Sequence, residues 1–365
     1  MVKLLFTLAG IGYGHQARVQ AIINELQKRA KPKIHIMTYG PAFKHLSKKF
    51  ATTSLRAYYY PEKQAFSILS TLKANWQIPK IFTENSKRTY AQIKQFEPDA
   101  IITDGELSTN RLFKKVKIPI ISIHNFKPAF FKQYMNENKL SMSLKAQYLF
   151  IKKIYSWIEK RSHQVIIPSL LSEKRTTFGK ISFVSPIVRT QSAELPNIHE
   201  LLCDLCIRPK SVLLQTGGTK LGQVLLKYIV RIAPNFKQEF LIFDTPLKGK
   251  NIRSLAFSPD ILQYLKVSDW AISLAGHSFL SEALVYRIPA FIVPIKSHLE
   301  QLVNAWTVEQ AGLAYTYTGD LTEKKLSSEL NKFLEQKKVI RNNLRKRKYG
   351  NGAAQAAEII LNQIK

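Results

Sequence analysis

Short apolar runs alternate with helical patterns along the first half of the chain. The runs cover residues 2–8, 34–39, 100–103, 119–123, 165–168 and 183–185, and helical patterns cover residues 15–29 and 107–115. Runs that are nearly continuous in apolar residues are typical of strands buried on both faces, so the pattern predicts a parallel sheet covered by helices. The segment Val2–Tyr39 predicts strand, glycine-rich turn, helix and strand, which is the start of a βαβ unit.

The same alternation restarts after a quieter stretch, residues 191–209, which contains Pro196 and Pro209. Strands are expected over residues 211–215, 240–243, 271–274 and 290–293, and helices over residues 221–232, 279–286, 300–310 and 353–364. The sequence therefore predicts an α/β protein of two Rossmann-like domains with parallel sheets, residues 1–190 and 210–350, joined by a linker over residues 191–209.

The composition excludes a disordered chain and points to an anionic partner. Of the 365 residues 45% are apolar and 22% charged, with a net charge of +30. Residues 1–190 alone hold 32 basic and 10 acidic side chains. This excess predicts contact with nucleic acid, a membrane surface or a phosphorylated substrate, mainly through the N-terminal half.

Cysteine content and hydropathy favour a cytoplasmic protein. Cys203 and Cys206 are too few for a disulfide framework, and with His199 nearby they still fall short of a typical zinc site. No run approaches the roughly 18 apolar residues of a membrane-spanning helix, and no secretory signal is expected. A protein of this kind that works at a membrane lies on its surface.

The first glycine turn, residues 10–15, carries a candidate base. It is similar to the dinucleotide fingerprint, but His15 stands where that motif needs a small residue, so NAD binding is not expected. A histidine at a helix start above the sheet suits a general base, because imidazole titrates near neutral pH. A helix-capping role without chemistry is the alternative.

Asp104 follows the strand expected over residues 100–103. Carboxyl ends of parallel strands are where open α/β sheets place function, and a carboxylate there can orient a histidine. A turn aspartate before Gly105 is the structural alternative.

Two further glycine turns suit a nucleotide-sugar. The segment Gln215–Thr219 precedes a helix, and backbone amides at such a turn can bind a diphosphate. Gly276 and Ser278 open another helix, and Glu282 stands one turn further, within reach of a ribose diol. Glu300 and Gln301 open the following helix and suit sugar hydroxyls.

The block from Ser268 to Ala305 resembles the donor-binding signature of GT-B glycosyltransferases. It is similar to that of the bacterial transferase that adds N-acetylglucosamine to lipid-linked peptidoglycan precursor, of the UDP-glycosyltransferases, and of uncharacterised prokaryotic glycosyltransferases. The resemblance implies two domains facing across a cleft and a final helix, residues 351–365, that crosses back to the first domain. It implies a His15 base with Asp104 as its orienting partner.

The resemblance also implies two sets of binding residues. The donor set is Gly217, Gly218, Thr219, Phe257, Gly276, His277, Ser278, Glu282, Glu300 and Gln301. The acceptor side is formed by Gly12, Gly14, His124 and Asn125.

The chain departs from the plant and animal enzymes at Leu274, where they carry a histidine. It has no Asp-x-Asp triplet, which argues against the transferases that hold diphosphate through a divalent metal. We therefore expect a metal-independent inverting glycosyltransferase without a cofactor. It moves a sugar from a nucleotide-sugar, most simply a UDP-sugar, to a lipid-linked or cell-envelope glycan. A UDP-N-acetylglucosamine 2-epimerase-like enzyme and a non-enzymatic nucleic-acid-binding protein are the alternatives.

Residues 125–161 are a candidate contact with an anionic membrane at the inner face. They hold eight basic, two acidic and eight aromatic side chains. A stripe at helical spacing predicts an interfacial helix: Leu144, Tyr148, Ile151, Tyr155 and Ile158. A core-facing helix with a solvated basic face is the alternative.

Overall fold

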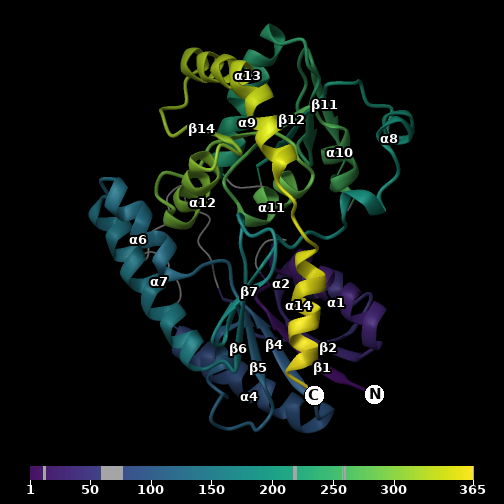
Figure 1. The fold of residues 1–365 in the computed structure, drawn as a ribbon, viewed down its shortest axis with the longest axis vertical. Helices are drawn as coiled ribbons and strands as arrows, with labels where there is room; N and C mark the ends of the chain where they lie inside the picture. The colour runs from purple at the N-terminus through teal and green to yellow at the C-terminus, as the bar shows by residue number, and fades with distance from the viewer. Residues whose placement is uncertain (11–13, 59–76, 217–219, 257, 259, 365) are drawn as a thin grey trace. The chain divides into compact units, whose positions relative to one another are not determined.

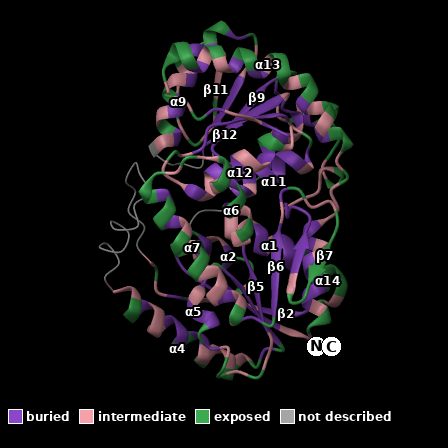
Figure 2. Ribbon diagram, turned by 60° about the vertical axis from the view of Figure 1, so that its left-hand side comes forward, coloured by how far each residue is buried: buried purple, intermediate pink, exposed green. Residues whose placement is uncertain are grey.

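The computed structural model describes all residues except 11–13, 59–76, 217–219, 257, 259 and 365. The described residues form two compact units. Unit 1 holds the chain up to Arg189 together with residues 349–364, and unit 2 holds Thr190–Lys348. Each unit is a twisted sheet covered by helices (Figure 1). The strands are largely buried, whereas the helices turn one face to solvent (Figure 2).

Unit 1 contains an eight-stranded sheet with the order β3-β2-β1-β4-β5-β6-β8-β7. All neighbouring pairs are parallel except β7–β8. The strands are β1 (Lys3–Leu8), β2 (Lys33–Thr38), β3 (Ala51–Ser54), β4 (Ala100–Asp104), β5 (Ile120–Ile123), β6 (Gln164–Pro168), β7 (Thr176–Phe178) and β8 (Ile181–Val184). The expected parallel strands are confirmed, and the antiparallel edge strand β7 is an addition to them.

The helices of unit 1 follow the predicted alternation. They are α1 (Gly14–Ala30), α2 (Gly40–Leu46), α4 (Ile78–Phe96), α5 (Leu107–Asn110), α6 (Pro128–Glu137), α7 (Met142–Lys160) and α14 (Gly352–Asn362). The helix expected to reach residue 115 is shorter, because the amides of Leu112 and Phe113 bond three residues back, to Thr109 and Asn110, rather than four.

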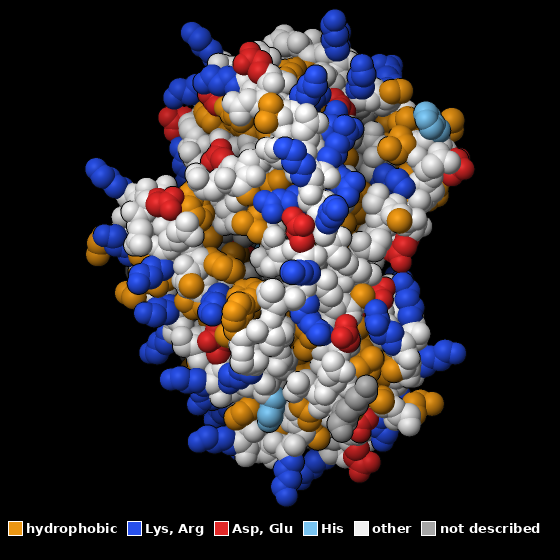
Figure 3. Space-filling view, viewed as in Figure 1, with side chains coloured by type: hydrophobic (Ala, Val, Ile, Leu, Met, Phe, Trp, Pro, Cys, Tyr) orange, Lys and Arg blue, Asp and Glu red, His pale blue; other side chains and the backbone are white. Residues whose placement is uncertain are grey.

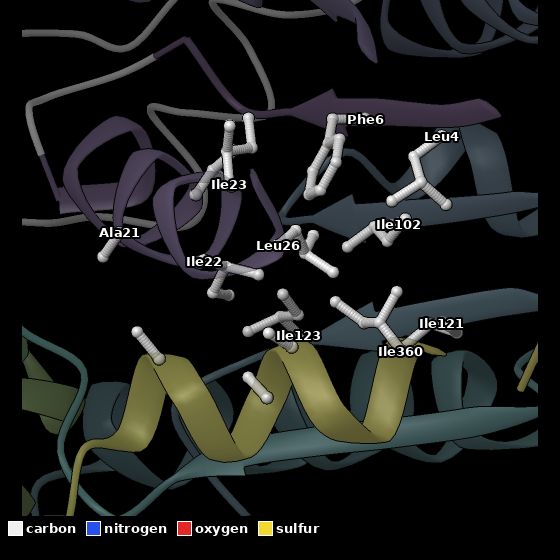
Figure 4. Close-up of a cluster of buried hydrophobic side chains, with 14 of the residues drawn as sticks. Leu4, Phe6, Ala21, Ile22, Ile23, Leu26, Ile102, Ile121, Ile123 and Ile360 are labelled. Atoms are coloured by element: carbon white, nitrogen blue, oxygen red, sulfur yellow. The ribbon is translucent and has the colours of Figure 1, made fainter. Parts of the chain in front are cut away.

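Helix α14 completes the core of unit 1, although it is far along the chain. It packs against α1, and Ile360 joins Leu4, Phe6, Ile22 and Leu26 in one buried cluster (Figure 4). Its first residue, Gly352, lies so close to the chain that a Cβ there would be 2.0 Å from the Ser185 carbonyl oxygen. Only glycine allows this approach.

Helix α7 turns its predicted stripe toward the protein. Leu144 and Ile158 are buried, Tyr148 lies near Phe131, and Tyr155 stacks on His124 with ring centroids 4.6 Å apart. The structure thus corrects the interfacial interpretation of this stripe, because its aromatic side chains face Phe131 of α6 and His124 after β5. None of the described helices is long and apolar enough to cross a bilayer.

Unit 2 contains a six-stranded parallel sheet with the order β11-β10-β9-β12-β13-β14. The strands are β9 (Val212–Gln215), β10 (Phe240–Phe243), β11 (Ile252–Leu255), β12 (Trp270–Ser273), β13 (Ala290–Ile292) and β14 (Tyr315–Thr316). Trp270, Phe291 and Phe333 are fully buried, and the indole of Trp270 lies against the ring of Phe333.

Unit 2 has helices on both faces of this sheet. They are α8 (Ile198–Asp204), α9 (Lys220–Ile232), α10 (Ile261–Val267), α11 (His277–Val285), α12 (Leu299–Gln310) and α13 (Glu323–Lys346), with short 3₁₀ turns η1 (Ser192–Glu194) and η2 (Ala233–Asn235). Helix α8 and η1 lie in the stretch expected as a linker. Lys337 and Arg341 tie α13 to the carboxylate of Asp269 at the start of β12.

Candidate functional site

The strand order of each unit reverses at one point, which marks where ligands bind in open α/β sheets. In unit 1 the reversal lies between β1 and β4, whose ends pair at Leu8 and Asp104. In unit 2 it lies between β9 and β12, where the Ser273 hydroxyl donates to the Gln215 carbonyl oxygen at 2.6 Å. The crevice outside the carboxyl ends of such strands is the expected binding place.

His15 and Asp104 meet at the reversal point of unit 1. Asp104 is the last residue of β4, and His15 stands in the first turn of α1, which follows β1. The His15 Nδ1 atom lies 2.8 Å from Asp104 Oδ1. The side chain of His15 is 32% exposed, whereas that of Asp104 is 1% exposed. The histidine can therefore reach a ligand while its partner stays out of solvent.

Gly105 makes room for the imidazole. Its φ of +75° belongs to the left-handed region, and a Cβ there would lie 2.8 Å from His15 Cε1. A side chain at this position would push the ring from the carboxylate, so glycine is needed for the turn and for the contact.

Arg18 is the main residue of the site that the sequence interpretation missed. Its Nε donates to Asp104 Oδ2 at 2.7 Å and its Nη2 to Oδ1 at 2.5 Å. Its Nη1 donates to the side-chain oxygen of Asn125, which follows β5. The available signal was spacing: Arg18 stands three residues after His15, on the same face of α1.

The charges around Asp104 decide its ionisation. Burial alone raises the pKa of this carboxyl, but the Arg18 guanidinium and then His15 hold its pKa well below the usual range. The ionised carboxylate accepts a hydrogen bond from His15, which assigns the proton to Nδ1 and leaves Nε2 as the basic nitrogen. This arrangement can remove a proton from a bound hydroxyl.

Three of the four predicted acceptor-side residues, Asn125, His124 and Gly14, lie among the described residues. Asn125 contacts Arg18, and His124 is buried under Tyr155. Burial lowers the pKa of His124 to about 4, so its ring is neutral at physiological pH. Gly14 begins α1, whereas Gly12 lies outside the described residues.

Glu106 is a second buried carboxyl at this edge of the sheet, and it was not predicted. It accepts hydrogen bonds from the backbone amide of Ser108 at 3.2 Å and from the Ser108 hydroxyl at 2.5 Å. Among the described residues, no cation contributes to its ionisation, and burial raises its pKa to about 7. An acidic residue two positions after Asp104 was the only sequence signal.

The start of α11 is the candidate diphosphate site of unit 2. Gly276 is the N-cap residue and, as a glycine, has no side chain with which to cap the helix. The Asn304 side-chain amide, from α12, donates to the Ala275 carbonyl oxygen at 3.0 Å and braces the turn. Ser278 is half-buried and His277 is buried. Amides in the first turn of a helix and the positive end of its dipole favour an anion.

The predicted sugar and ribose residues lie on α11 and α12, which follow the adjacent strands β12 and β13. Glu282 is buried, one turn into α11, and Glu300 is half-buried in the first turn of α12. The Gln301 side-chain oxygen accepts from the Ile295 amide at 3.0 Å, so its amide NH₂ is the part that can donate to a ligand.

Four predicted donor residues, Gly217, Gly218, Thr219 and Phe257, lie outside the described residues. On either side of residues 217–219, α9 comes close to the residue that follows β9. A Cβ on Gly222 would lie 2.6 Å from that of Thr216.

Metal-ligating side chains do not cluster in the described part of the chain: it has no group of three or more His, Cys, Asp or Glu residues that could hold an ion. Cys203 and Cys206 are exposed and unbridged.

A family model described as Glycosyl transferase family 1 matches residues 2–336. The chain belongs to this glycosyltransferase family. It is therefore a transferase enzyme, as the sequence predicted. A relative described as an uncharacterized glycosyltransferase, from Methanosarcina acetivorans, is 23% identical over 337 residues, covering 85% of this chain and 84% of the relative.

A second relative carries a more specific description. It is the UDP-N-acetylglucosamine–N-acetylmuramyl-(pentapeptide) pyrophosphoryl-undecaprenol N-acetylglucosamine transferase of Thermosipho africanus, 24% identical over 86% of both chains.

Solved structures show the fold. A UDP-glucosyltransferase from Polygonum tinctorium superimposes with a TM-score of 0.71 at 12% identity, covering 100% of this chain and 99% of its own. MurG from Acinetobacter baumannii superimposes with a TM-score of 0.64 at 14% identity, covering 99% and 100%. The predicted GT-B fold is thus confirmed.

Proposed function

We propose that this family member is a metal-independent, inverting glycosyltransferase without a cofactor. It moves a sugar from a UDP-sugar to a lipid-linked or cell-envelope glycan acceptor. The observation that carries the proposal is the partly exposed His15 ring bonded to the buried, ionised Asp104 at the reversal point of unit 1. This is the arrangement that a general base for a hydroxyl nucleophile requires.

The proposed reaction is one displacement. Nε2 of His15 takes the proton of the acceptor hydroxyl while that oxygen bonds to the anomeric carbon of the sugar. The bond between this carbon and the diphosphate oxygen breaks, and its electron pair leaves with the nucleoside diphosphate. Amides at the start of α11 stabilise the added negative charge. Attack opposite the leaving group inverts the anomeric centre.

The proposed donor combines the α11 turn with the carboxylate of Glu282 and the amide of Gln301. Uracil as the base is supported by the Thermosipho relative, whose name specifies UDP-N-acetylglucosamine. A spinosyn rhamnosyltransferase with the same fold, at a TM-score of 0.66, was solved with thymidine diphosphate. The nucleotide is therefore the part of the donor to test first.

The outward face of α7 supports a membrane-located acceptor. Met142 and Leu149 are 78% and 63% exposed, and Phe150 is 45% exposed, between the exposed Lys145 and Lys152. Hydrophobic and basic side chains are intermixed where Figure 1 places α6 and α7 (Figure 3). Such a face suits an anionic lipid surface. We place the enzyme in the cytoplasm, at the inner face of the membrane, where its acceptor would lie.

Substitution of His15 tests this proposal. The wild-type protein, in detergent with a chelator, is given UDP-N-acetylglucosamine and an undecaprenyl-pyrophosphoryl acceptor, and both UDP release and product are measured. His15→Gln should lower kcat by about 10²–10⁴, the usual contribution of a general base, with UDP affinity unchanged. His199→Gln, on the exposed side of α8, is the matched control.

Two results would contradict the proposal. Turnover in His15→Gln close to that of the wild type would show that His15 is not the base. Turnover that appears only after a divalent metal is restored would remove the metal-independent mechanism.

A further inference from the structure

The guanidinium of Arg18 is enclosed beside the His15–Asp104 pair. Its side chain is 6% exposed, and its fork meets both oxygens of the Asp104 carboxylate, at 2.7 and 2.5 Å. Oδ1 of that carboxylate is shared with His15 Nδ1, which itself lies 3.3 Å from Arg18 Nη2. The carboxylate therefore serves two partners at once.

We propose that Arg18 is a positioning residue for this pair: it fixes the plane of the Asp104 carboxylate and, by compensating its charge, opposes protonation of the His15 ring. Its meaning for catalysis rests on the proposed role of His15 as the base. Its effect on the ring itself does not.

The orienting part of the proposal follows from the fork. Two parallel hydrogen bonds define the carboxylate plane, and the remaining arm, Nη1, donates to Asn125. The guanidinium thus joins α1 to the ends of β4 and β5. A lysine ammonium has the charge but lacks the planar fork, so it cannot hold both carboxylate oxygens and the Asn125 oxygen in this geometry.

The charge part of the proposal follows from the opposite charges of Asp104 and Arg18 beside the His15 ring. In a histidine–aspartate pair the carboxylate stabilises the protonated imidazole. Here the adjacent guanidinium offsets that carboxylate, and a second cation 3.3 Å from Nη2 is disfavoured. The other titratable group of this cluster, His124 at the end of β5, is neutral and adds no charge. Among the described residues, the charged groups that contact the ring are Asp104 from β4 and Arg18 from α1 itself.

The consequence is that Nε2 of His15 is available to take a proton from a bound hydroxyl. The guanidinium of Arg18, with Nη2 3.3 Å from the His15 ring, disfavours a second positive charge on that ring. Arg18 also favours the tautomer with the proton on Nδ1, since the oriented Oδ1 of Asp104 accepts the hydrogen bond from Nδ1–H.

Nitrogen NMR of the full-length protein tests both parts without any substrate. Histidine is labelled with ¹⁵N, the ring signals are followed with pH, and His15→Gln identifies the signal of His15. In Arg18→Gln the titration midpoint of this ring should rise by about one pH unit, the effect of removing a neighbouring unit charge. Arg29→Gln, a partly exposed arginine on the same helix, is the matched control and should leave the midpoint unchanged.

Arg18→Lys separates orientation from charge. Its midpoint should stay close to that of the wild type, while the Nδ1–H form gives way to a mixture of the two tautomers. This variant also decides the question if Arg18→Gln does not fold, as judged by circular dichroism.

Each part can fail separately. A folded Arg18→Gln with an unmoved or lowered midpoint would overturn the charge role. An Arg18→Lys ring that remains wholly in the Nδ1–H form would overturn the orienting role. Retained turnover in His15→Gln would instead contradict the proposed function, and the conclusions drawn from these titrations would still hold.

Discussion

Two carboxyls at the same edge of the unit 1 sheet are held in different charge states. Asp104 and Glu106 are both buried, and burial raises the pKa of each. The Arg18 guanidinium reverses that effect at Asp104, whereas the described partners of Glu106 are hydroxyl and amide groups and its pKa is raised to about 7. One arginine thus separates an ionised partner for His15 from a carboxyl that titrates near neutrality.

The titration of Glu106 should be visible in the stability of the protein. Its folded-state pKa lies above the ordinary value of 4.5, so between 4.5 and about 7 the native protein binds more protons than the unfolded chain. The free energy of unfolding therefore falls as pH rises through this window, by about 3 kcal/mol from this group. Glu106→Gln removes the titration and keeps an acceptor for Ser108.

Urea unfolding at several pH values from about 4.5 to about 8 measures this effect. Relative to the wild type, Glu106→Gln should gain stability progressively as pH rises. Glu137→Gln, at an exposed position of α6, should run parallel to the wild type. A difference between Glu106→Gln and the wild type that does not change with pH would contradict the assignment.

At the residue scale, the sequence predicted site residues that can be identified by their position after a buried strand. His15 and Asp104 follow buried strands, so the parallel sheet had to bring them to one edge. Arg18 and Glu106 could not be found this way, because charged residues in a basic chain are usually solvated. The partners of Arg18, Asp104 and Asn125, also lie far along the sequence.

Helix α7 presents two apolar faces with different tasks. The inward stripe, from Leu144 to Ile158, packs in unit 1, and the outward face exposes Met142, Leu149 and Phe150. Periodicity identified the helix. It assigned membrane contact to the larger apolar stripe, which packs inside unit 1 instead.

Substitutions on the outward face should weaken membrane binding without unfolding the protein. Leu149→Ser with Phe150→Ser removes two exposed side chains, each worth about 1.5–3 kcal/mol when fully buried, so sedimentation with phosphatidylglycerol-containing vesicles should weaken by at least about tenfold. Val339→Ser, at a 60% exposed site on α13, is the matched control. Equal sedimentation of the double variant and the wild type would contradict the docking face.

At the scale of elements, buried strands were predictable and exposed ones were not. β1, β4 and β10 are mostly apolar and almost wholly buried, whereas the three residues of the edge strand β7 are all exposed. An exposed strand without alternation differs little from a loop in sequence, and pairing with β8 is what defines it.

The whole molecule repeats one plan in its two units. Each has a mainly parallel sheet whose order reverses once, with a helix start at the reversal. This repetition could be predicted, because both halves open with the same strand–glycine–helix pattern. The return of α14 to unit 1 was expected from the family resemblance alone, since its alanine-rich buried face does not specify which sheet it covers.

The charge of the molecule is also a property of the whole chain. The net charge of +30 is concentrated in the first 190 residues, the part that contains α6, α7 and the His15 site. Family membership accounts for the fold and the transferase class, and it leaves the identity of the donor nucleotide as the central claim to be measured.

Calorimetric titration of the full-length protein with UDP, GDP, TDP and ADP, in the presence of a chelator, tests that claim most directly. We predict that UDP binds tightest, that binding needs no metal, and that Glu282→Gln weakens it at least about tenfold through loss of charge-assisted hydrogen bonds to the ribose. Glu335→Gln, at an exposed position of α13, should bind as the wild type does. The account would be contradicted if UDP failed to bind, bound only with a divalent metal, or bound Glu282→Gln as tightly as the wild type.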